Sequence, residues 1–182
     1  MNKKIRLLII TNSIFIFADT LILPMYALFI KKIGGGIELA GLLFGLKFLV
    51  SFIVSLFIVR LKDKIFLDDK MYKLNLFLRG LAWLSLVFFQ TIPMLIVAQL
   101  MIGTSEAFGA PAFNTLFSEN LDTQHHIKEW GMLELTYALI IALSSGISGY
   151  IVVFFGFKVL FGLMSLLALA SLLLFNYRDN PA

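Results

Sequence analysis

Long apolar runs fill almost the whole chain, and this feature limits the fold more than any other. The first run extends from Arg6 to Ile30 and contains a single carboxylate, Asp19. Apolar residues make up 60% of the sequence, whereas soluble domains contain roughly 45–50%. Because exposing so much apolar surface to water is unfavourable, we expect an integral membrane protein. A membrane span needs roughly 20 residues, so six spans would use the 182 residues and leave no soluble domain.

Charged and polar segments at 31–36, 60–73 and 118–130 separate the apolar runs. The expected spans are 7–30, 38–59, 74–90, 93–117, 131–154 and 158–176. The first run is too long for a signal peptide, so we expect it to be retained. We therefore predict an all-α membrane protein in which residues 1–182 form a single six-helix transmembrane bundle. The third and sixth spans are nearly all apolar and should face lipid, while the other four should line a cavity or pack closely.

The distribution of Lys and Arg predicts one orientation in the membrane. With the N-terminus inside, the inner segments hold Lys3, Lys4, Arg6, Arg60, Lys62, Lys64, Lys70, Lys73, Lys128 and Arg178, and the outer segments hold Lys31, Lys32 and Lys158. Cytoplasmic loops carry such an excess of basic residues. We therefore predict a protein of the inner, cytoplasmic membrane with both termini in the cytoplasm. The net charge of +4 reflects this orientation, and we do not expect nucleic-acid binding.

Three charged residues lie deep in their spans. At about 1.5 Å per residue, Asp19, Lys47 and Glu106 lie roughly 14–20 Å from the nearest span end that we expect. Arg79 lies about one turn from the inner side, where its long side chain could reach water. The three deep residues either form a neutralised network that only fixes packing, or face a water-filled cavity and bind substrate or protons. We favour the second reading, because ionisable residues inside a membrane are functional-site candidates.

In this reading Lys47 is the counter-charge, and two acids against one base leave one carboxyl free to take up a proton. Tyr26 and Asn114 extend the predicted substrate-binding or proton-binding site. The aromatic side chains nearby suit an amphiphilic organic solute, although they are equally compatible with core or lipid-facing positions.

Small residues recur at short spacing in the second and fifth spans. Gly41 and Gly45 are four residues apart, and Gly146 and Gly149 lie in a similar small-residue run. Such spacing lets helices approach closely. The pattern has two explanations: packing inside one bundle, or a seam between two bundles.

Several functional classes lack the residues they need. Cysteine is absent, which excludes disulfides and thiolate metal sites. His125 and His126 are adjacent on a polar loop and cannot point the same way on a helix, so we predict no metal and no cofactor. Ser148 lies in a G-x-S-G string, but no span holds a histidine that could activate it. We therefore predict that the protein is not an enzyme.

Three segments, in order, carry a resemblance to a known family. The loop VRLKDKIFLDDK contains the Asp63-Lys64 pair, QLMIGTSEAFGAPAFNTLFSEN holds glycines and a proline around Glu106, and SSGISGYIVVFFGFKVLF ends in Gly156-Phe157-Lys158. These segments resemble the loop between helices two and three, helix four and helix five of the major facilitator superfamily, in its N-terminal six-helix half. Gln99 replaces the arginine that the family often uses in proton transfer, so we expect Glu106 to carry that role in this chain.

The resemblance covers the whole chain and implies half of a twelve-helix fold, built as a 3+3 inverted repeat. It implies a site at the midplane lined by helices one and four, helices two and five at the seam, and an inner-loop gate at Asp63 and Lys64. We therefore expect a secondary active transporter of a small organic solute. It would work by alternating access as a parallel homodimer of half-transporters, coupled to protons and surrounded by membrane lipid.

Two alternatives stay open. The chain could be a half that does not transport and pairs with another membrane protein. It could also be the N-terminal fragment of a twelve-helix transporter, although the short tail NYRDNPA gives no sign of a following domain.

Overall fold

The computed structural model describes residues 3–60, 68–121 and 126–179, and every regular element in these ranges is helical. The elements are α1 (Lys3–Thr20), the 3-10 turn η1 (Leu23–Met25), α2 (Tyr26–Lys32), α3 (Ile37–Arg60), α4 (Asp68–Phe88), α5 (Ile92–Glu119) and α6 (His126–Asp179). The predicted all-α fold is therefore confirmed for the described residues. They contain five long helices and the short α2, rather than six separate spans.

The expected first span is broken near its C-terminal end. α1 stops at Thr20, and a 3-10 turn with Pro24 in its first positions leads into α2. Proline lacks a backbone N–H and clashes with the preceding turn, so it interrupts a helix interior. α5, in contrast, continues through Pro111.

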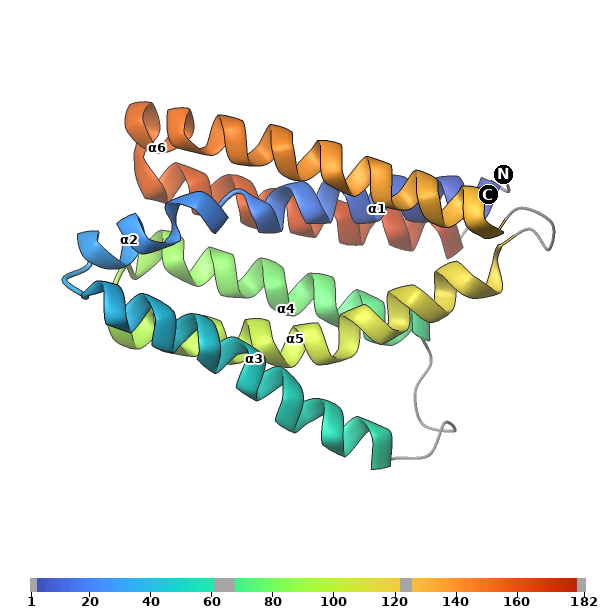
Figure 1. The fold of residues 1–182 in the computed structure, drawn as a ribbon, viewed down its shortest axis with the longest axis horizontal. Coiled ribbons are helices and arrows are strands. Elements are labelled where there is room, and N and C mark those ends of the chain that lie inside the picture. The colour runs from blue at the N-terminus through green and yellow to red at the C-terminus, as the bar shows by residue number, and fades with distance from the viewer. Residues whose placement is uncertain (1–2, 61–67, 122–125, 180–182) are drawn as a thin grey trace.

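The last two expected spans both lie within α6, which has 54 residues. Gly156 interrupts α6 with φ 80° and ψ 173°, a backbone conformation that favours glycine. The ribbon reverses there, so two arms of α6 run antiparallel (Figure 1). By length and apolar composition, four helical stretches of the described chain could cross a membrane: Lys4–Lys32, Ile37–Arg60, Ile92–Glu119 and His126–Tyr177.

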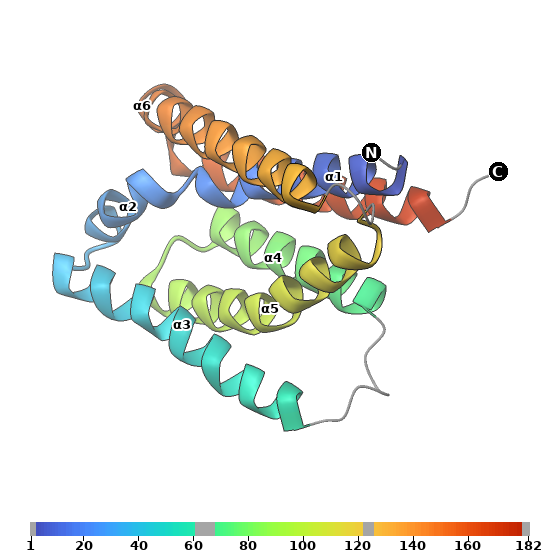
Figure 2. The same cartoon turned by 45° about the vertical axis from the view of Figure 1, so that its right-hand side comes forward.

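The helices pack around α4, which contacts both α5 and α6, while α1 packs against α6 and α3 against α5. α1 begins and α6 ends at the same end of the bundle, here called the terminal end, and the opposite end is the far end (Figure 1). The first arm of α6 and α3 lie on opposite sides of the bundle in both views (Figures 1 and 2). The prediction that the third span faces lipid is partly wrong, because α4 buries polar side chains between its neighbours.

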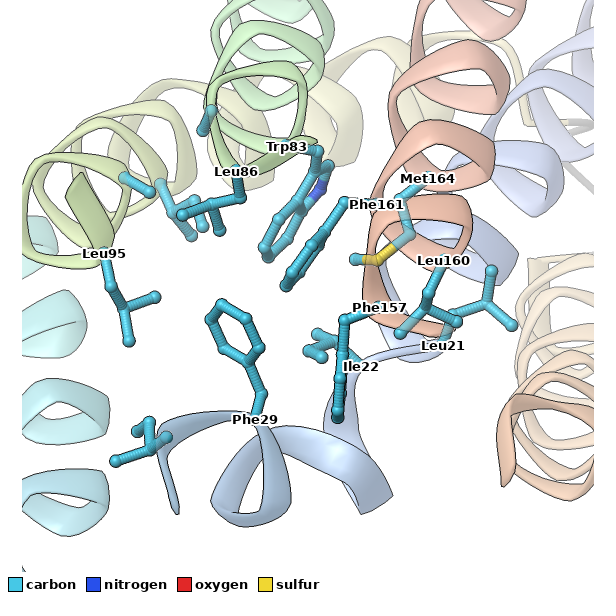
Figure 3. Close-up of a cluster of buried hydrophobic side chains, with 14 of the residues drawn as sticks. Leu21, Ile22, Phe29, Trp83, Leu86, Leu95, Phe157, Leu160, Phe161 and Met164 are labelled. Carbon is cyan, nitrogen blue, oxygen red and sulfur yellow. The ribbon is translucent and has the colours of Figure 1, made fainter. Parts of the chain in front are cut away.

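Two apolar clusters fill the bundle. In the cluster at the far end, Phe29 meets Phe161 edge to face at 4.8 Å between ring centroids, and Trp83 stacks on Phe161 at 6.1 Å (Figure 3). The cluster at the terminal end includes Tyr72 and Phe175, whose centroids lie 4.9 Å apart. Close van der Waals packing of such side chains holds helices together inside a membrane. Polar side chains occupy the layer between the two clusters.

Glycine allows close contact at two places on α5. A Cβ at Gly103 would clash with the backbone carbonyl of Lys47 on α3, and one at Gly109 would clash with the amide of Asn75 on α4. At Gly41, Gly45 and Gly146 a Cβ would meet no atom within 4 Å. Among the described residues these three glycines therefore pack against no other helix.

Candidate functional site

An ion-paired group joins three helices at the centre of the bundle. Arg79 on α4 donates from Nη1 to Oδ1 of Asp19 on α1 at 2.8 Å. It donates from Nη2 to Oε2 of Glu106 on α5 at 2.5 Å. The Arg79 side chain is only 3% exposed, whereas Asp19 is 22% and Glu106 35% exposed. One buried cation therefore holds two partly accessible carboxylates.

The ion-paired group lies midway along the bundle. In each of the three chain segments, side chains on one side of the charged residue belong to one apolar cluster, and side chains on its other side belong to the other cluster. On α4, Leu76 belongs to the cluster at the terminal end and Trp83 to the cluster at the far end. Arg79 between them lies eleven residues after α4 begins, roughly 17 Å along the helix axis. The expectation that Arg79 reaches water near a membrane surface is therefore wrong. α4 begins six residues before the span that the sequence predicted, because the charged residues at 68–73 had been assigned to a loop.

Lys47 does not take the predicted place of the counter-charge. Its Nζ lies 4.4 Å from the ring centroid of Phe48 and 5.0 Å from that of Phe44, which is one turn earlier in α3. Such contacts stabilise an ammonium group by about 0.5–2 kcal/mol. No ion pair links Lys47 to Asp19 or Glu106 in the structure of the described residues, and Arg79 fills that role.

A small cavity of about 30 Å³, here called the Asp19 cavity, lies on the far-end side of Arg79. Its lining includes Asp19, Lys47 and the predicted site residue Tyr26. Gln99 donates from Nε2 to the Tyr26 hydroxyl at 2.7 Å. The Gln99 Oε1 and the Trp83 indole N–H, which belongs to another lining residue, have no partner. A volume of this size holds about one water molecule.

A larger cavity of about 180 Å³, here called the Glu106 cavity, lies on the terminal-end side of Arg79. It is lined by Asn12, Phe15, Ile16, Tyr72, Asn75, Arg79, Glu106, Gly109, Ala110, Phe113, Asn114 and Tyr137. Tyr72 donates to Oδ1 of Asn12 at 2.8 Å, and the amide nitrogen of Asn12 donates to the Tyr137 hydroxyl. These bonds tie α1, α4 and the first arm of α6 together on one wall of the cavity.

The structure divides the predicted site residues between the two cavities. Asp19, Lys47 and Tyr26 line the Asp19 cavity, while Glu106 and Asn114 line the Glu106 cavity. The predicted gate residues Asp63 and Lys64 lie outside the described residues. The glycines of the predicted seam lie apart from both cavities.

Sequence reasoning missed Arg79, the residue that lies between the two cavities. Arg79 lines both, and the buried amides Asn12 and Asn75 complete the wall of the larger one. Each amide stands in an apolar helix, where an unpaired polar group costs several kcal/mol. That cost could have marked both amides as site candidates in the sequence, because an amide inside an apolar helix needs polar neighbours.

The arrangement is suited to binding rather than to covalent chemistry. When both acids are ionised, the ion-paired group carries one net negative charge, which favours uptake of a proton or a cation. Ser148 donates to the backbone oxygen of Ser145 at 2.9 Å and lines neither cavity. No three His, Asp or Glu side chains gather as a metal site within the ranges described, and His125 lies outside them.

Comparison with known proteins gives a family and a fold. The sequence model described as the Major Facilitator Superfamily matches residues 8–182. No curated protein matches the chain. The in meso crystal structure of the POT family transporter PepTSo is similar, with a TM-score of 0.74 at 14% identity, covering 98% of this chain and 38% of PepTSo. At this identity the likeness concerns the fold, and the chain spans well under half of PepTSo.

Proposed function

Because the chain belongs to the Major Facilitator Superfamily, a family of transporters and not of enzymes, we propose that it is one half of a secondary active transporter. In this proposal its six spans, with the two arms of α6 counted separately, form a 3+3 inverted repeat. A small organic solute and protons use the central site. The observation that carries the proposal is the ion-paired group of Asp19, Arg79 and Glu106 at mid-depth between two cavities.

The charges of this group support coupling to protons. Arg79 can neutralise one carboxylate, so the second stays charged at a cost unless a proton or a cation joins it. Glu106 is the more exposed of the two acids and lines the larger cavity. We infer that Glu106 takes up the proton, while Asp19 keeps Arg79 in place.

The two cavities support alternating access. Apart from Arg79, their linings share no residue, and they lie on opposite sides of its guanidinium. A movement that breaks either ion pair would change which carboxylate faces which cavity. Such movements of a bundle around a central site are how transporters of this kind expose substrate to one side at a time.

The open space at the seam glycines, on the apolar outer faces of α3 and of the first arm of α6, supports a second half that packs there. Large apolar side chains stand exposed along α3, at Phe44, Phe48, Phe52 and Phe57, and along α6, at Leu135, Leu139, Leu143, Tyr150 and Phe154. The seam glycines Gly41 and Gly45 lie on α3, and Gly146 and Gly149 on α6, with open space beside them or a single distant contact.

Depth along the helices also matches across this seam. Gly45 lies eight residues after α3 begins at the far end, and Gly149 lies seven residues before the break at Gly156. Both positions are therefore about 10–12 Å from the far end. A groove of about 530 Å³ beside Gly146 and Gly149 has room for a partner's aromatic side chain. We infer a parallel dimer in which α3 of each copy packs on α6 of the other.

The second half has two candidate sources. A second copy of the chain would double Asp19 and Glu106 around a shared cavity. A further segment of a longer protein is the other source, and the 38% coverage of PepTSo is compatible with that alternative. Bulky variants such as Gly45→Leu and Gly149→Leu should split a homodimer in mild detergent and leave the monomer inserted. Dimers that persist in both variants would place the seam elsewhere.

Flux into proteoliposomes tests the transport proposal. We expect a screen of small organic solutes to find one whose uptake depends on a proton gradient. The neutral variants Asp19→Asn and Glu106→Gln should abolish gradient-driven flux or shift its pH dependence, because the two acids share Arg79. Wild-type rates and pH dependence in both variants would mean that these acids only stabilise the bundle.

The proposed location is the inner membrane with both termini in the cytoplasm, supported by the ends of α1 and α6 lying at one end of the bundle (Figure 1) and by the excess of basic residues there. The inner-loop gate at Asp63 and Lys64 stays a prediction. If it acts across the seam, Asp63→Asn should change the accessibility of cysteines placed in the cavity at the terminal end.

A further inference from the structure

We propose that the Glu106 cavity binds the ammonium group of a small protonated amine, held by the Glu106 carboxylate and the side-chain oxygen of Asn75. This inference rests on the proposed transport function and names the class of its substrate. Three features of the cavity carry it: its charge, an unpartnered buried acceptor, and its aromatic walls.

The charge at the cavity is incompletely neutralised. Among the described residues that line the cavity, Arg79 and Glu106 alone are charged, and Arg79 is shared with Asp19 on the other side. Lys47, the other cation at this depth, lines the Asp19 cavity and lies over the rings of its own helix. One of the two Glu106 oxygens accepts from Arg79. Glu106 lines the cavity, and its other oxygen is the one that we propose binds a cationic ligand.

Asn75 adds an acceptor that has no donor in the described structure. Its side chain is 3% exposed, and its Oδ1 has no hydrogen-bond partner. Gly109 leaves the space in which this amide lies, because a Cβ there would clash with it. A buried acceptor without a partner loses its interaction with water and gains nothing in return. An ammonium group, which has three donors and no acceptor, would satisfy Asn75 and Glu106 together.

The walls and the size of the cavity narrow the ligand further. Phe15, Tyr72 and Phe113 supply aromatic faces, which attract organic cations. Arg79 already lies 5.5 Å from the centroid of Phe15, so this wall accommodates a cation. A volume of about 180 Å³ is below the range of roughly 300–1,000 Å³ that drug-sized ligands occupy. A short alkylamine therefore fits, whereas a large amphiphile does not.

Propylammonium chloride is the probe for a direct binding test on the purified full-length chain in lipid nanodiscs. Tryptophan fluorescence reports the melting temperature as the probe is titrated against sodium chloride at constant ionic strength. We expect a saturable rise with propylammonium and none with 1-propanol, which has the same length but no charge. An equal rise with 1-propanol, or no saturable rise with propylammonium, would overturn the proposal.

Variants locate the binding to this cavity. Asn75→Leu should weaken propylammonium affinity about tenfold, a loss of about 1.4 kcal/mol, and Glu106→Gln should weaken it at least as much. Gln99→Leu is the matched control, because it removes a buried amide with an unpartnered oxygen from the Asp19 cavity. It should leave affinity unchanged, and an equal loss in Gln99→Leu and Asn75→Leu would contradict the assignment.

A cavity-filling variant keeps the test decisive if Glu106→Gln fails to fold. Ala110 lines the cavity and is exposed, so Ala110→Phe should fill the cavity and block binding without removing any of the ion-paired side chains. Unchanged affinity in Ala110→Phe would refute the site. The flux assay separates this inference from the transport proposal. Proton-driven flux of a solute that is not an amine, without propylammonium binding, would reject the amine site alone, whereas binding without any flux would reject transport alone.

Discussion

Removing the Arg79 charge should be the most damaging single change to the central ion-paired group. Arg79→Met keeps much of the apolar stem of the side chain and deletes the guanidinium that Asp19 and Glu106 share. It leaves two carboxylates facing each other near the middle of the bundle. Breaking a buried ion pair by removing one partner costs about 3–5 kcal/mol.

The exposure of the two acids sets the expected size of the effect. Asp19 is 22% and Glu106 is 35% exposed, so water or a proton can relieve part of the penalty. We therefore expect Arg79→Met to lower the free energy of unfolding by about 3 kcal/mol, at the low end of that range. Lys47→Met removes a contact with two rings instead of an ion pair, and should cost only about 1 kcal/mol.

Unfolding by SDS, followed by tryptophan fluorescence in mixed micelles, measures both effects. The triple variant Arg79→Met, Asp19→Asn, Glu106→Gln is the matched control, because it removes the charges together. It should regain most of the lost stability, since no uncompensated charge remains. A larger loss in Lys47→Met than in Arg79→Met, or a triple variant as unstable as Arg79→Met, would refute the assignment of Arg79 as the counter-charge.

Three further changes probe the fold in the same unfolding assay. Gly103→Ala should destabilise the bundle by about 1–3 kcal/mol, because its Cβ would clash with a backbone carbonyl of α3. The control Gly162→Ala, with open space around the new Cβ, should be nearly neutral. Equal effects of the two variants would contradict the close α3–α5 contact. Gly156→Ala should cost about 1–3 kcal/mol, since φ is 80° and ψ is 173° there, and a neutral result would speak against the sharp reversal of α6. Tyr137→Phe removes the acceptor of the Asn12 amide and should cost about 0.5–1.5 kcal/mol; no loss of stability would mean that this bond does not hold the cavity wall.

Hydropathy alone led to the helical class and to the approximate boundaries of most spans. The expected span 38–59 agrees with α3, and 93–117 lies within α5. The start of α4 was missed because charged residues occupy its first turns at 68–73, and hydropathy weighs them against membrane insertion. The same error placed Arg79 near a surface, and so its role as the shared counter-charge was not predicted.

The glycines illustrate a second limit of sequence reasoning. Spacing marked Gly41, Gly45, Gly146 and Gly149 as close-packing positions, yet none of them approaches another helix closely within the described chain. Gly103 and Ala107 have the same four-residue spacing but were not singled out, and Gly103 forms the tight contact with α3. Which glycine is buried depends on how each helix is rotated about its axis, and that rotation is set by neighbours distant in sequence.

Disulfide crosslinking in native membranes tests the central claim in its homodimer form, that a second copy of the chain packs on α3 and on the first arm of α6. The chain has no cysteine, so a Gly45→Cys, Gly149→Cys variant reports only this seam, and Leu166→Cys on the second arm of α6 is an exposed control. A disulfide requires Cα atoms about 4.4–6.8 Å apart. The account predicts an oxidised product of twice the 20.5 kDa chain mass for the double variant and none for the control. A chain that stays monomeric under oxidation, or a control that crosslinks as efficiently, would contradict it.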